Sequence, residues 1–291
     1  MKVYCDDKSI IRNEEWGWLG QIKTTSIFKY LFLPYGPFSS NKESNDAIFK
    51  SIVETAKKNK LDFIKFEPRG DISNEFITSL GAKKVKNYNP KDTLVIDLTQ
   101  SIDDIKSAMS SSTKNMINKS QKRGSRVLRS NDINLFPKFI KLMHKTAQHA
   151  GINNHPDNYY KTIVDVLFKN KTAEFYFVEA DGTEPFVGGI IYTDKSTKYY
   201  AHIGSDYAVN KLYGGSTLMV WQMIDDAKKE GLKYFDFCGV SAVDADKSDK
   251  LYGVSIFKRS FGGETVSNIG TYVLPINKFK YSLYDKLKKI V

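Results

Sequence analysis

The sequence contains little cysteine and little histidine, and it has no long apolar run. Its two cysteines, Cys5 and Cys238, lie far apart, which excludes a disulfide framework and a CxxC metal site. Its four histidines form no HxxxH or His/Cys cluster, so we expect no metal ion. No apolar run approaches the roughly 20 residues that cross a bilayer. Asp6 and Asp7 stand where a signal peptide would be apolar, so we predict a cytoplasmic protein with reduced thiols.

Common catalytic signatures are also missing. The sequence has no Walker A loop, no dinucleotide-binding glycine fingerprint and no Gly-x-Ser-x-Gly elbow, which removes the usual motifs of P-loop, Rossmann and α/β-hydrolase enzymes. What it does contain is enough apolar material for packed cores, since 41% of its residues are hydrophobic. A length of 291 residues corresponds to about two domains.

Positive charge is in clear excess. The chain has 44 lysine and arginine residues against 33 aspartate and glutamate residues, which gives a net charge of +11. This surplus favours a polyanionic partner such as nucleic acid, a nucleotide-linked substrate or an anionic membrane. The alternative is that the charge only keeps the protein soluble. One segment has seven basic residues and no acidic one: Lys106, Lys114, Lys119, Lys122, Arg123, Arg126 and Arg129.

The sequence contains a degenerate internal repeat. Residues 48–66 resemble residues 219–237, because in both segments apolar residues at helical spacing precede Ala-Lys-Lys, a short turn and an alternating apolar stretch. Residues 76–82 resemble residues 257–263 in the same order along the chain. Each copy is therefore predicted to contain an amphipathic helix, a tight turn and a buried strand. We interpret the repeat as a duplicated α/β domain.

Two basic residues distinguish the second copy from the first. Lys258 and Arg259 stand where the first copy has Ile77 and Thr78. Because they lie between two phenylalanines, we expect one or both cations to face a cleft. A solvated lysine on a helix or strand face is the alternative, and it is the ordinary state of lysine.

A single carboxylate lies in the otherwise apolar segment Tyr234–Val240. Asp236 is predicted near the end of a strand, and Gly239 after it permits a sharp turn. Its carboxylate is suited to pairing with a cation such as Lys258, to orienting a substrate amine or to accepting a proton. An aspartate that caps the next turn is an equal alternative.

Two glycine-containing turns are candidate ligand-binding segments. The turn Lys211–Ser216, which includes Tyr213, precedes a predicted helix, and its small residues expose N–H groups that bind an anion or a carbonyl. It is similar to the turn by which GNAT acyltransferases bind the pyrophosphate of coenzyme A. The matching turn of the first copy, Leu33–Phe38, is rigid and contains Tyr35, which either packs against a substrate or fills the core.

Several of these segments together resemble one known family. Pro90–Gly124, Tyr234–Gly239 and Gly253–Gly262 are similar to segments of the FemABX peptidyltransferases, and so is the turn Leu33–Phe38. The most specific piece is the Phe-Lys-x-x-Phe-Gly motif at Phe257–Gly262, which follows the Phe-Asp-Phe-x-Gly strand. The resemblance covers nearly the whole chain.

The resemblance implies an α/β (α+β) fold with two tandem GNAT-like domains, each a mixed and largely antiparallel sheet flanked by helices. Domain 1 is expected to comprise residues 1–108 with a C-terminal return segment, residues 276–291. Domain 2, residues 109–275, is expected to carry the active site. The strands that follow the repeated helices are expected at Thr93–Leu98 and Thr271–Leu274, one in each domain.

Members of this family move an amino acid from aminoacyl-tRNA to an amine of a peptidoglycan precursor. The resemblance therefore implies an aminoacyltransferase that builds the interpeptide bridge and needs no cofactor. The expected partners are a charged tRNA and a UDP-linked or lipid-linked muropeptide, with peripheral contact with the inner membrane face, and we expect a monomer. Both substrates are polyanions, which agrees with the net charge of +11.

The resemblance also assigns residues. Lys258 supplies positive charge to the tetrahedral oxyanion, with help from the backbone of Phe257, and Asp236 orients the attacking amine. His155 and Tyr159 fit the muropeptide site, where the family has an arginine followed four residues later by a tyrosine. Histidine is a poorer and pH-dependent anion binder. The other residues expected to contact substrates are Tyr35, Tyr213 and Arg259.

Two other functions are compatible with the sequence. An acyl-CoA-dependent N-acyltransferase with the same double-domain fold would use the turn Lys211–Ser216 and would bind coenzyme A. A nucleic-acid-binding protein without catalytic activity would use the basic segment Lys106–Arg129, and its affinity would depend strongly on salt.

Overall fold

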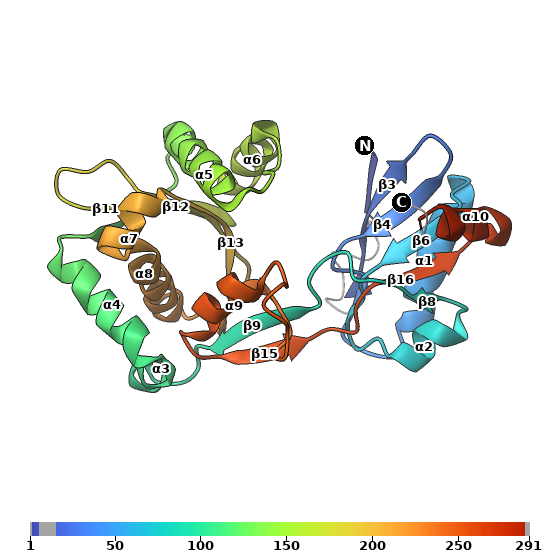
Figure 1. The fold of residues 1–291 in the computed structure, drawn as a ribbon. Coiled ribbons are helices and arrows are strands. Elements are labelled where there is room, and N and C mark those ends of the chain that lie inside the picture. The colour runs from blue at the N-terminus through green and yellow to red at the C-terminus, as the bar shows by residue number, and fades with distance from the viewer. Residues whose placement is uncertain (1, 6–15, 289–291) are drawn as a thin grey trace. The chain divides into compact units, whose positions relative to one another are not determined.

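The computed structural model describes residues 2–5 and 16–288. The chain divides into two compact units (Figure 1). Unit 1 combines Met1–Lys91 with Ser267–Val291, and unit 2 is the continuous segment Asp92–Val266. Asp6, Asp7 and residues 289–291 of the predicted return segment lie outside the described residues. Among the described residues, no helix is both long enough and apolar enough to span a membrane.

Unit 1 is built on a six-stranded sheet, whose strands in spatial order are β1 (Lys2–Cys5), β3 (Leu19–Thr24), β4 (Lys29–Leu33), β6 (Phe63–Phe66), β16 (Tyr272–Pro275) and β8 (Lys83–Lys84). A smaller sheet contains β2 (Trp16–Gly17), β5 (Phe38–Ser39) and β7 (Arg69–Gly70). Its helices are α1 (Asn45–Lys58), α2 (Asn74–Ser79) and α10 (Lys278–Lys288).

Helices cover both faces of the large sheet in unit 1. The β4–β6 pair is parallel and the other pairs are antiparallel. α1 makes the crossover between the two parallel strands, and its buried Ile48 packs in one core with Leu31 and Phe66. On the opposite face, the Tyr281 ring of α10 packs at 5.5 Å from the Phe63 ring. The C-terminal helix therefore belongs to the core of unit 1.

Unit 2 is built on a seven-stranded sheet, whose strands in spatial order are β10 (Arg126–Ser130), β11 (Ala173–Glu179), β12 (Val187–Thr193), β13 (Thr197–Ser205), β14 (Tyr234–Val240), β9 (Asp92–Asp97) and β15 (Glu264–Ser267). Its helices are α3 (Ile102–Ala108), α4 (Ser111–Lys122), α5 (Phe136–Ala150), α6 (Asp157–Ile163), α7 (Tyr207–Tyr213), α8 (Gly215–Lys229) and α9 (Tyr252–Arg259). Short 3-10 and π-helical turns occupy Ile133–Leu135 and Val164–Phe168.

Both faces of this second sheet are buried as well. The β13–β14 pair is parallel, and α7 and α8 lie between these two strands in the sequence. Four other pairs are antiparallel: β10–β11, β11–β12, β12–β13 and β14–β9. Successive residues of β11 point to opposite sides, because side chains alternate along a strand. Tyr176 lies in the core that contains Leu218 of α8, and Phe177 lies in the core that contains Phe139 of α5.

This architecture confirms the predicted fold class, which is α/β with two tandem units, each a mixed and largely antiparallel sheet flanked by helices. The repeat has a clear structural counterpart. In unit 1, α1 leads into β6, which pairs in parallel with β4, the strand before the helix. In unit 2, α8 leads into β14, which pairs in parallel with β13.

The strand that follows each copy pairs in the other unit. β9 follows α2 in the sequence but pairs with β14 in unit 2, and β16 follows α9 but pairs with β6 in unit 1. The units consequently divide after Lys91 and before Ser267, and not at the predicted boundaries after residues 108 and 275. Alternating apolar residues identify a strand but do not specify its partner. The prediction from the repeat therefore placed each strand in the same domain as the copy that it follows.

Candidate active site

α9 is fixed against the end of β14 and the residue that follows it by three hydrogen bonds. The Ser241 N–H donates to Ser255 Oγ at 2.8 Å. Lys258 Nζ donates to the Gly239 carbonyl oxygen at 2.7 Å. Arg259 donates to the Ser241 carbonyl oxygen at 2.5 Å. Because Ser255 and Lys258 lie about one turn apart on the buried side of the helix, this attachment holds the lysine at the end of β14.

The Lys258 ammonium is buried but only partly hydrogen-bonded. Lys258 is 7% exposed, and among the described residues its hydrogen-bond partner is the Gly239 carbonyl alone. An ammonium has three N–H donors, so two have no hydrogen-bond acceptor among the described residues, although the ammonium also lies 6.0 Å from the centre of the Tyr200 ring. Burial lowers the pKa of Lys258, while Cys238 and Asp236 act in the opposite direction. A desolvated cation with unused donors is suited to stabilising a developing oxyanion.

A bulge in β14 brings the Gly239 carbonyl to Lys258. The register between β14 and β9 shifts between Asp236 and Gly239, and Cys238 has a left-handed φ of 59°. Asp236 Oδ1 accepts hydrogen bonds from the Cys238 N–H at 2.6 Å and from the Thr93 hydroxyl, which stabilise the bulge. Burial raises the pKa of the Cys238 thiol to about 12, so this thiol stays protonated and is a poor nucleophile.

The bulge and the lysine lie where two parallel strands separate. β13 pairs with β14 only through Thr197–Tyr199 and Tyr234–Asp236. Beyond these residues, β13 continues along β12 and β14 continues along β9. An opening at the carboxyl ends of parallel strands is where many α/β proteins bind ligands.

Aromatic side chains and two histidines gather at α6. The rings of Tyr159 and Tyr160 lie 5.9 and 5.3 Å from the ring of His202 on β13, and Tyr192 on β12 lies 5.6 Å from it. His155 packs against Tyr159 at 4.2 Å. Burial raises the pKa of Tyr192, with smaller contributions from Tyr159, Cys238 and Tyr160.

His202 gives unit 2 a predicted pH dependence. Burial, with a smaller contribution from His155, lowers the pKa of His202 to about 4 from an ordinary value near 6.5. The unfolded chain therefore binds a proton here at a higher pH than the folded protein. The contribution to stability is complete above about pH 6.5 and is lost as the pH falls towards about 4, with a decrease of about 3 kcal/mol.

Urea denaturation across this pH interval measures that loss. The His202→Gln variant is expected to lose most of the dependence, because glutamine does not titrate. The His149→Gln variant serves as a matched control, because His149 is exposed, and it is expected to keep the dependence. An unchanged pH profile in His202→Gln would contradict this assignment.

Packing explains both glycines of the turn Lys211–Ser216. Gly214 has a left-handed φ of 72°, and a side chain there would meet Met116 at 2.4 Å. A side chain at Gly215 would meet the Phe186 ring at 2.5 Å. Close approach of neighbouring side chains therefore requires glycine at these positions, with or without a ligand.

The same turn uses one of its backbone donors internally. The Ser216 N–H donates to Asn210 Oδ1 at 2.9 Å, which removes a donor that a pyrophosphate would need. The Tyr213 ring packs 5.3 Å from the Phe186 ring. The turn therefore offers a pyrophosphate one backbone donor fewer than its sequence suggests, and Tyr213 has a packing partner in Phe186.

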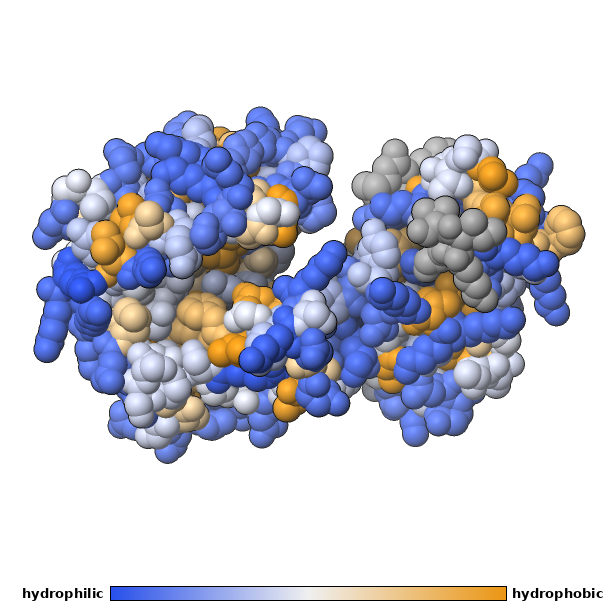
Figure 2. All heavy atoms as spheres, in the orientation of Figure 1, coloured by the Kyte–Doolittle hydropathy of each residue, from blue (hydrophilic) through white to orange (hydrophobic). Residues whose placement is uncertain are grey.

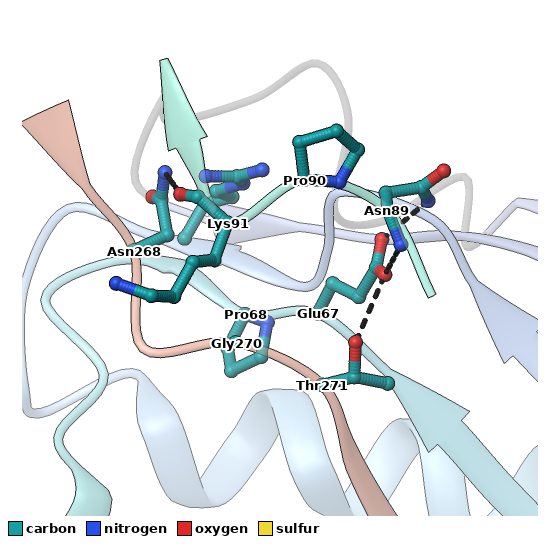
Figure 3. A pocket seen from close by; sticks show the side chains of 9 residues that line it. Glu67, Pro68, Asn89, Pro90, Lys91, Asn268, Gly270 and Thr271 are labelled. Atoms are coloured by element: carbon teal, nitrogen blue, oxygen red, sulfur yellow. Dashed lines mark hydrogen bonds between the residues drawn. The ribbon is translucent and has the colours of Figure 1, made fainter. Parts of the chain in front are cut away.

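Tyr35 lies in unit 1, in a turn anchored by a buried carboxylate. Glu67 Oε2 accepts hydrogen bonds from the Tyr35 N–H at 3.1 Å and from the Asn89 side chain at 2.7 Å. Its Oε1 accepts from the Thr271 hydroxyl at 3.1 Å (Figure 3). The Arg69 guanidinium lies 5.0 Å from the exposed Tyr35 ring. Glu67, Arg69, Asn89 and Thr271 line a small pocket of unit 1.

The structure brings part of the predicted set together. Lys258 and Arg259 of α9 bond the segment that follows Asp236 on β14, and Phe257 packs edge-on against Phe261 at 5.3 Å. His155 and Tyr159 form the aromatic group at α6. Within residues 2–5 and 16–288, no three His, Cys, Asp or Glu side chains are grouped as metal ligands.

Sequence reasoning missed Tyr192 and His202. They meet across two strands whose register shifts at Tyr192, so no spacing along the chain brings them together. The apolar alternation of both strands was the only available signal, and it predicts which face a residue occupies without predicting its neighbours.

The fold and this site define a two-unit α/β protein with a buried lysine at the separated ends of two parallel strands. A sequence model of the FemAB family matches residues 77–187 and 177–289. The chain therefore belongs to the FemAB family, which confirms the predicted family.

Individual relatives agree with this membership. Aminoacyltransferase FemA of Staphylococcus aureus (strain MW2) is 26% identical over 153 residues, which cover 53% of this chain and 36% of that protein. The match thus spans about a third of the length of these curated relatives. The crystal structure of FemX has a TM-score of 0.82 at 19% identity and covers 97% of this chain and 90% of that chain. L-PGS from Bacillus licheniformis has a TM-score of 0.61 at 11% identity, covering 91% and 85%. At these identities the structural likeness establishes the fold.

Proposed function

We propose that this chain is an aminoacyltransferase that moves an amino acid from aminoacyl-tRNA to an amine of a peptidoglycan precursor stem peptide. Membership of the FemAB family and the similarity to proteins named aminoacyltransferase FemA support the proposal. The observation that carries it is the buried Lys258 ammonium, which lies where β13 and β14 separate and has two N–H donors with no hydrogen-bond acceptor among the described residues.

The proposed reaction is aminolysis of an ester. The acceptor nitrogen forms a bond to the ester carbonyl carbon, the carbonyl oxygen becomes an oxyanion, and the bond to the ribose oxygen then breaks. The proton lost by the amine ends on that ribose oxygen. Lys258 donates to the oxyanion in a site from which water is largely excluded, where such a bond is strongest. The ester is already activated, so positioning supplies much of the acceleration and no cofactor is needed.

Neighbouring residues are proposed to position the lysine. Asp236 holds the β14 bulge through its two hydrogen bonds, and we therefore assign it a positioning role ahead of direct contact with the amine. Phe257 fixes the helix backbone before Lys258 by packing on the core, and Arg259 ties the helix to the Ser241 carbonyl.

The acceptor is proposed to bind at the aromatic group of α6. Tyr159 is 42% exposed with His155 against its ring, so both side chains are accessible to a peptide or a phosphate. Substrate contacts by Tyr35 and Tyr213 stay predictions, as do the monomeric state and contact with the inner membrane face. The net charge of +11 supports polyanionic substrates in general.

Product mass after incubation with charged tRNA tests the proposal. The full chain is mixed with a pool of labelled aminoacyl-tRNAs and with UDP-linked or lipid-linked muropeptide precursor. We expect the precursor to gain the mass of one aminoacyl residue while the corresponding tRNA is discharged. Product formed with acetyl coenzyme A and with no charged tRNA would instead indicate an acyl-CoA-dependent N-acyltransferase.

A further inference from the structure

The structure divides the basic segment of the sequence into engaged and unengaged residues. Arg126 and Arg129 each pair with two acidic side chains. Lys106 lies over the Trp221 ring at 5.1 Å, and Lys114 donates to a backbone carbonyl of α3. Each of these four residues therefore has a partner within unit 2.

Three residues of the segment remain, and we call them the α4 basic strip: Lys119, Lys122 and Arg123. Their side chains are exposed and have no hydrogen bond or ion pair with any residue that the structure describes. Their spacing of three and four residues places them on one side of α4, away from the buried Thr113 and Ile117. α4 contains no acidic residue. The left edge of the molecule, where Figure 1 shows α4, is strongly hydrophilic in Figure 2.

α4 is attached directly to the helix that carries Lys258. The Ser110 N–H donates to the Ser260 carbonyl oxygen at 2.9 Å, and the Thr113 hydroxyl donates to Ser260 Oγ at 2.8 Å. Ser260 is the C-cap residue of α9. A helix rises 1.5 Å per residue, so the α4 basic strip begins about 14 Å from this attachment and ends about 20 Å from it.

We propose that the α4 basic strip binds the phosphate backbone of the RNA donor, a few nucleotides behind its esterified 3′ end. This inference rests on the proposed function, which places that end at Lys258. An RNA strand carries one phosphate per nucleotide, so a strand leading away from Lys258 presents a row of negative charges over the distance that the strip covers. Three cations on one helix face match such a row.

The composition of the strip favours RNA over a membrane surface. The other exposed residues of α4 include Asn115, Asn118 and Gln121, which are polar. A helix that lies in a membrane interface needs an apolar face to insert, and the exposed face of α4 has none among these residues. The polar amides are instead suited to hydrogen bonds with phosphate and ribose oxygens.

The experiment compares the full chain with a triple variant, Lys119→Gln, Lys122→Gln and Arg123→Gln. Binding of uncharged tRNA is measured over a series of salt concentrations. We expect the affinity of the variant to fall about 10- to 100-fold near 0.1 M salt, and the slope of log affinity against log salt to decrease in magnitude by about 2 to 3, because each lost phosphate contact removes nearly one unit. The matched control carries Lys50→Gln, Lys57→Gln and Lys58→Gln, which remove the same charge from exposed positions of α1. It should bind like the unmodified protein.

A second measurement separates RNA binding from chemistry. Transfer is compared between full-length charged tRNA and the same amino acid esterified to a short single-stranded RNA that does not reach the strip. The triple variant should show a KM for charged tRNA at least about 10-fold higher and an unchanged rate with the short donor. Equal losses with both donors would overturn the proposal, because the strip would then act through the active site.

The two proposals fail in different ways. Unchanged tRNA affinity and salt slope in the triple variant would overturn the α4 inference even if transfer is observed. Strip-dependent binding to vesicles of anionic lipid, with no strip-dependent binding to RNA, would overturn it as well. Failure of the unmodified protein to use either donor would overturn the proposed function, while the tRNA-binding comparison would still decide the role of the strip.

Discussion

Replacing Lys258 by alanine will lower the rate of amino-acid transfer by about 10²- to 10³-fold while the chain stays folded. The loss of one preorganised donor to an oxyanion has this magnitude in other acyl-transfer enzymes. Lys258 is buried and donates to a single backbone carbonyl, so the substitution removes a charge and one hydrogen bond without breaking an ion pair. Steady-state transfer at saturating donor, together with circular dichroism of the variant, measures the two effects separately.

The pH dependence of transfer provides the control for this substitution. Burial lowers the pKa of Lys258, so the ammonium loses its proton at a lower pH than an exposed lysine does, and the rate should fall as the pH rises through that pKa. Lys258→Arg keeps a cation that stays protonated, so any remaining activity should lack this alkaline decline. A transfer rate in Lys258→Ala equal to that of the unmodified protein would remove the residue from the mechanism.

Replacing Lys198 by methionine will destabilise unit 2 by about 3 kcal/mol, because Glu174 and Glu230 then lose their buried cation and keep only the partly exposed Arg129 as an ion-pair partner among the described residues. Lys198 is completely buried. Its Nζ lies 3.0 Å from Glu230 and 3.6 Å from Glu174, and it donates to the Tyr176 hydroxyl at 3.1 Å. Hydrogen exchange of the backbone amides in β11 and β13 measures the loss of stability. These strands carry Lys198, Glu174 and Tyr176, and their amides exchange only when the surrounding core opens.

An exposed ion pair supplies the comparison. Lys161 and Asp165 lie one turn apart on the surface with their charged atoms at 2.8 Å. Lys161→Met should cost less than about 1 kcal/mol, because water screens an exposed pair and side-chain entropy opposes it. Equal effects of the two substitutions would show that the buried cluster contributes no more than a surface pair.

Local sequence signals predicted helices and their ends well. Residues 48–66 were predicted to contain an amphipathic helix, a tight turn and a buried strand, and the structure has α1 over Asn45–Lys58 and β6 over Phe63–Phe66. This succeeded because a helix, the turn after it and the following strand are indicated by residues a few positions apart. Strand partners depend on residues far apart in sequence, so β9 and β16 were identified as strands but assigned to the wrong units.

The same distinction applies to the candidate site. Comparison of the two copies identified Lys258, because a lysine in place of Ile77 departs from the packing pattern of the repeat. The comparison of the copies did not show that the Asp236 carboxylate would accept a hydrogen bond from the Cys238 N–H of its own strand. This bond depends on the β14 bulge, and the only sequence signal for the bulge is the nearby Gly239. The two glycines at the start of α8 were ambiguous for a physical reason: a bound phosphate and a close-packed side chain both favour a residue without a Cβ.

The position of β16 in the sequence sets the order in which the two sheets can be finished during translation. β16 pairs with both β6 and β8, yet it is synthesised after the whole of unit 2. Unit 2 is continuous, so all seven of its strands are available while β6 still forms an open edge of unit 1. A ribosome that stops before residue 272 therefore releases a chain with one complete sheet and one unprotected strand, and such a strand recruits other chains.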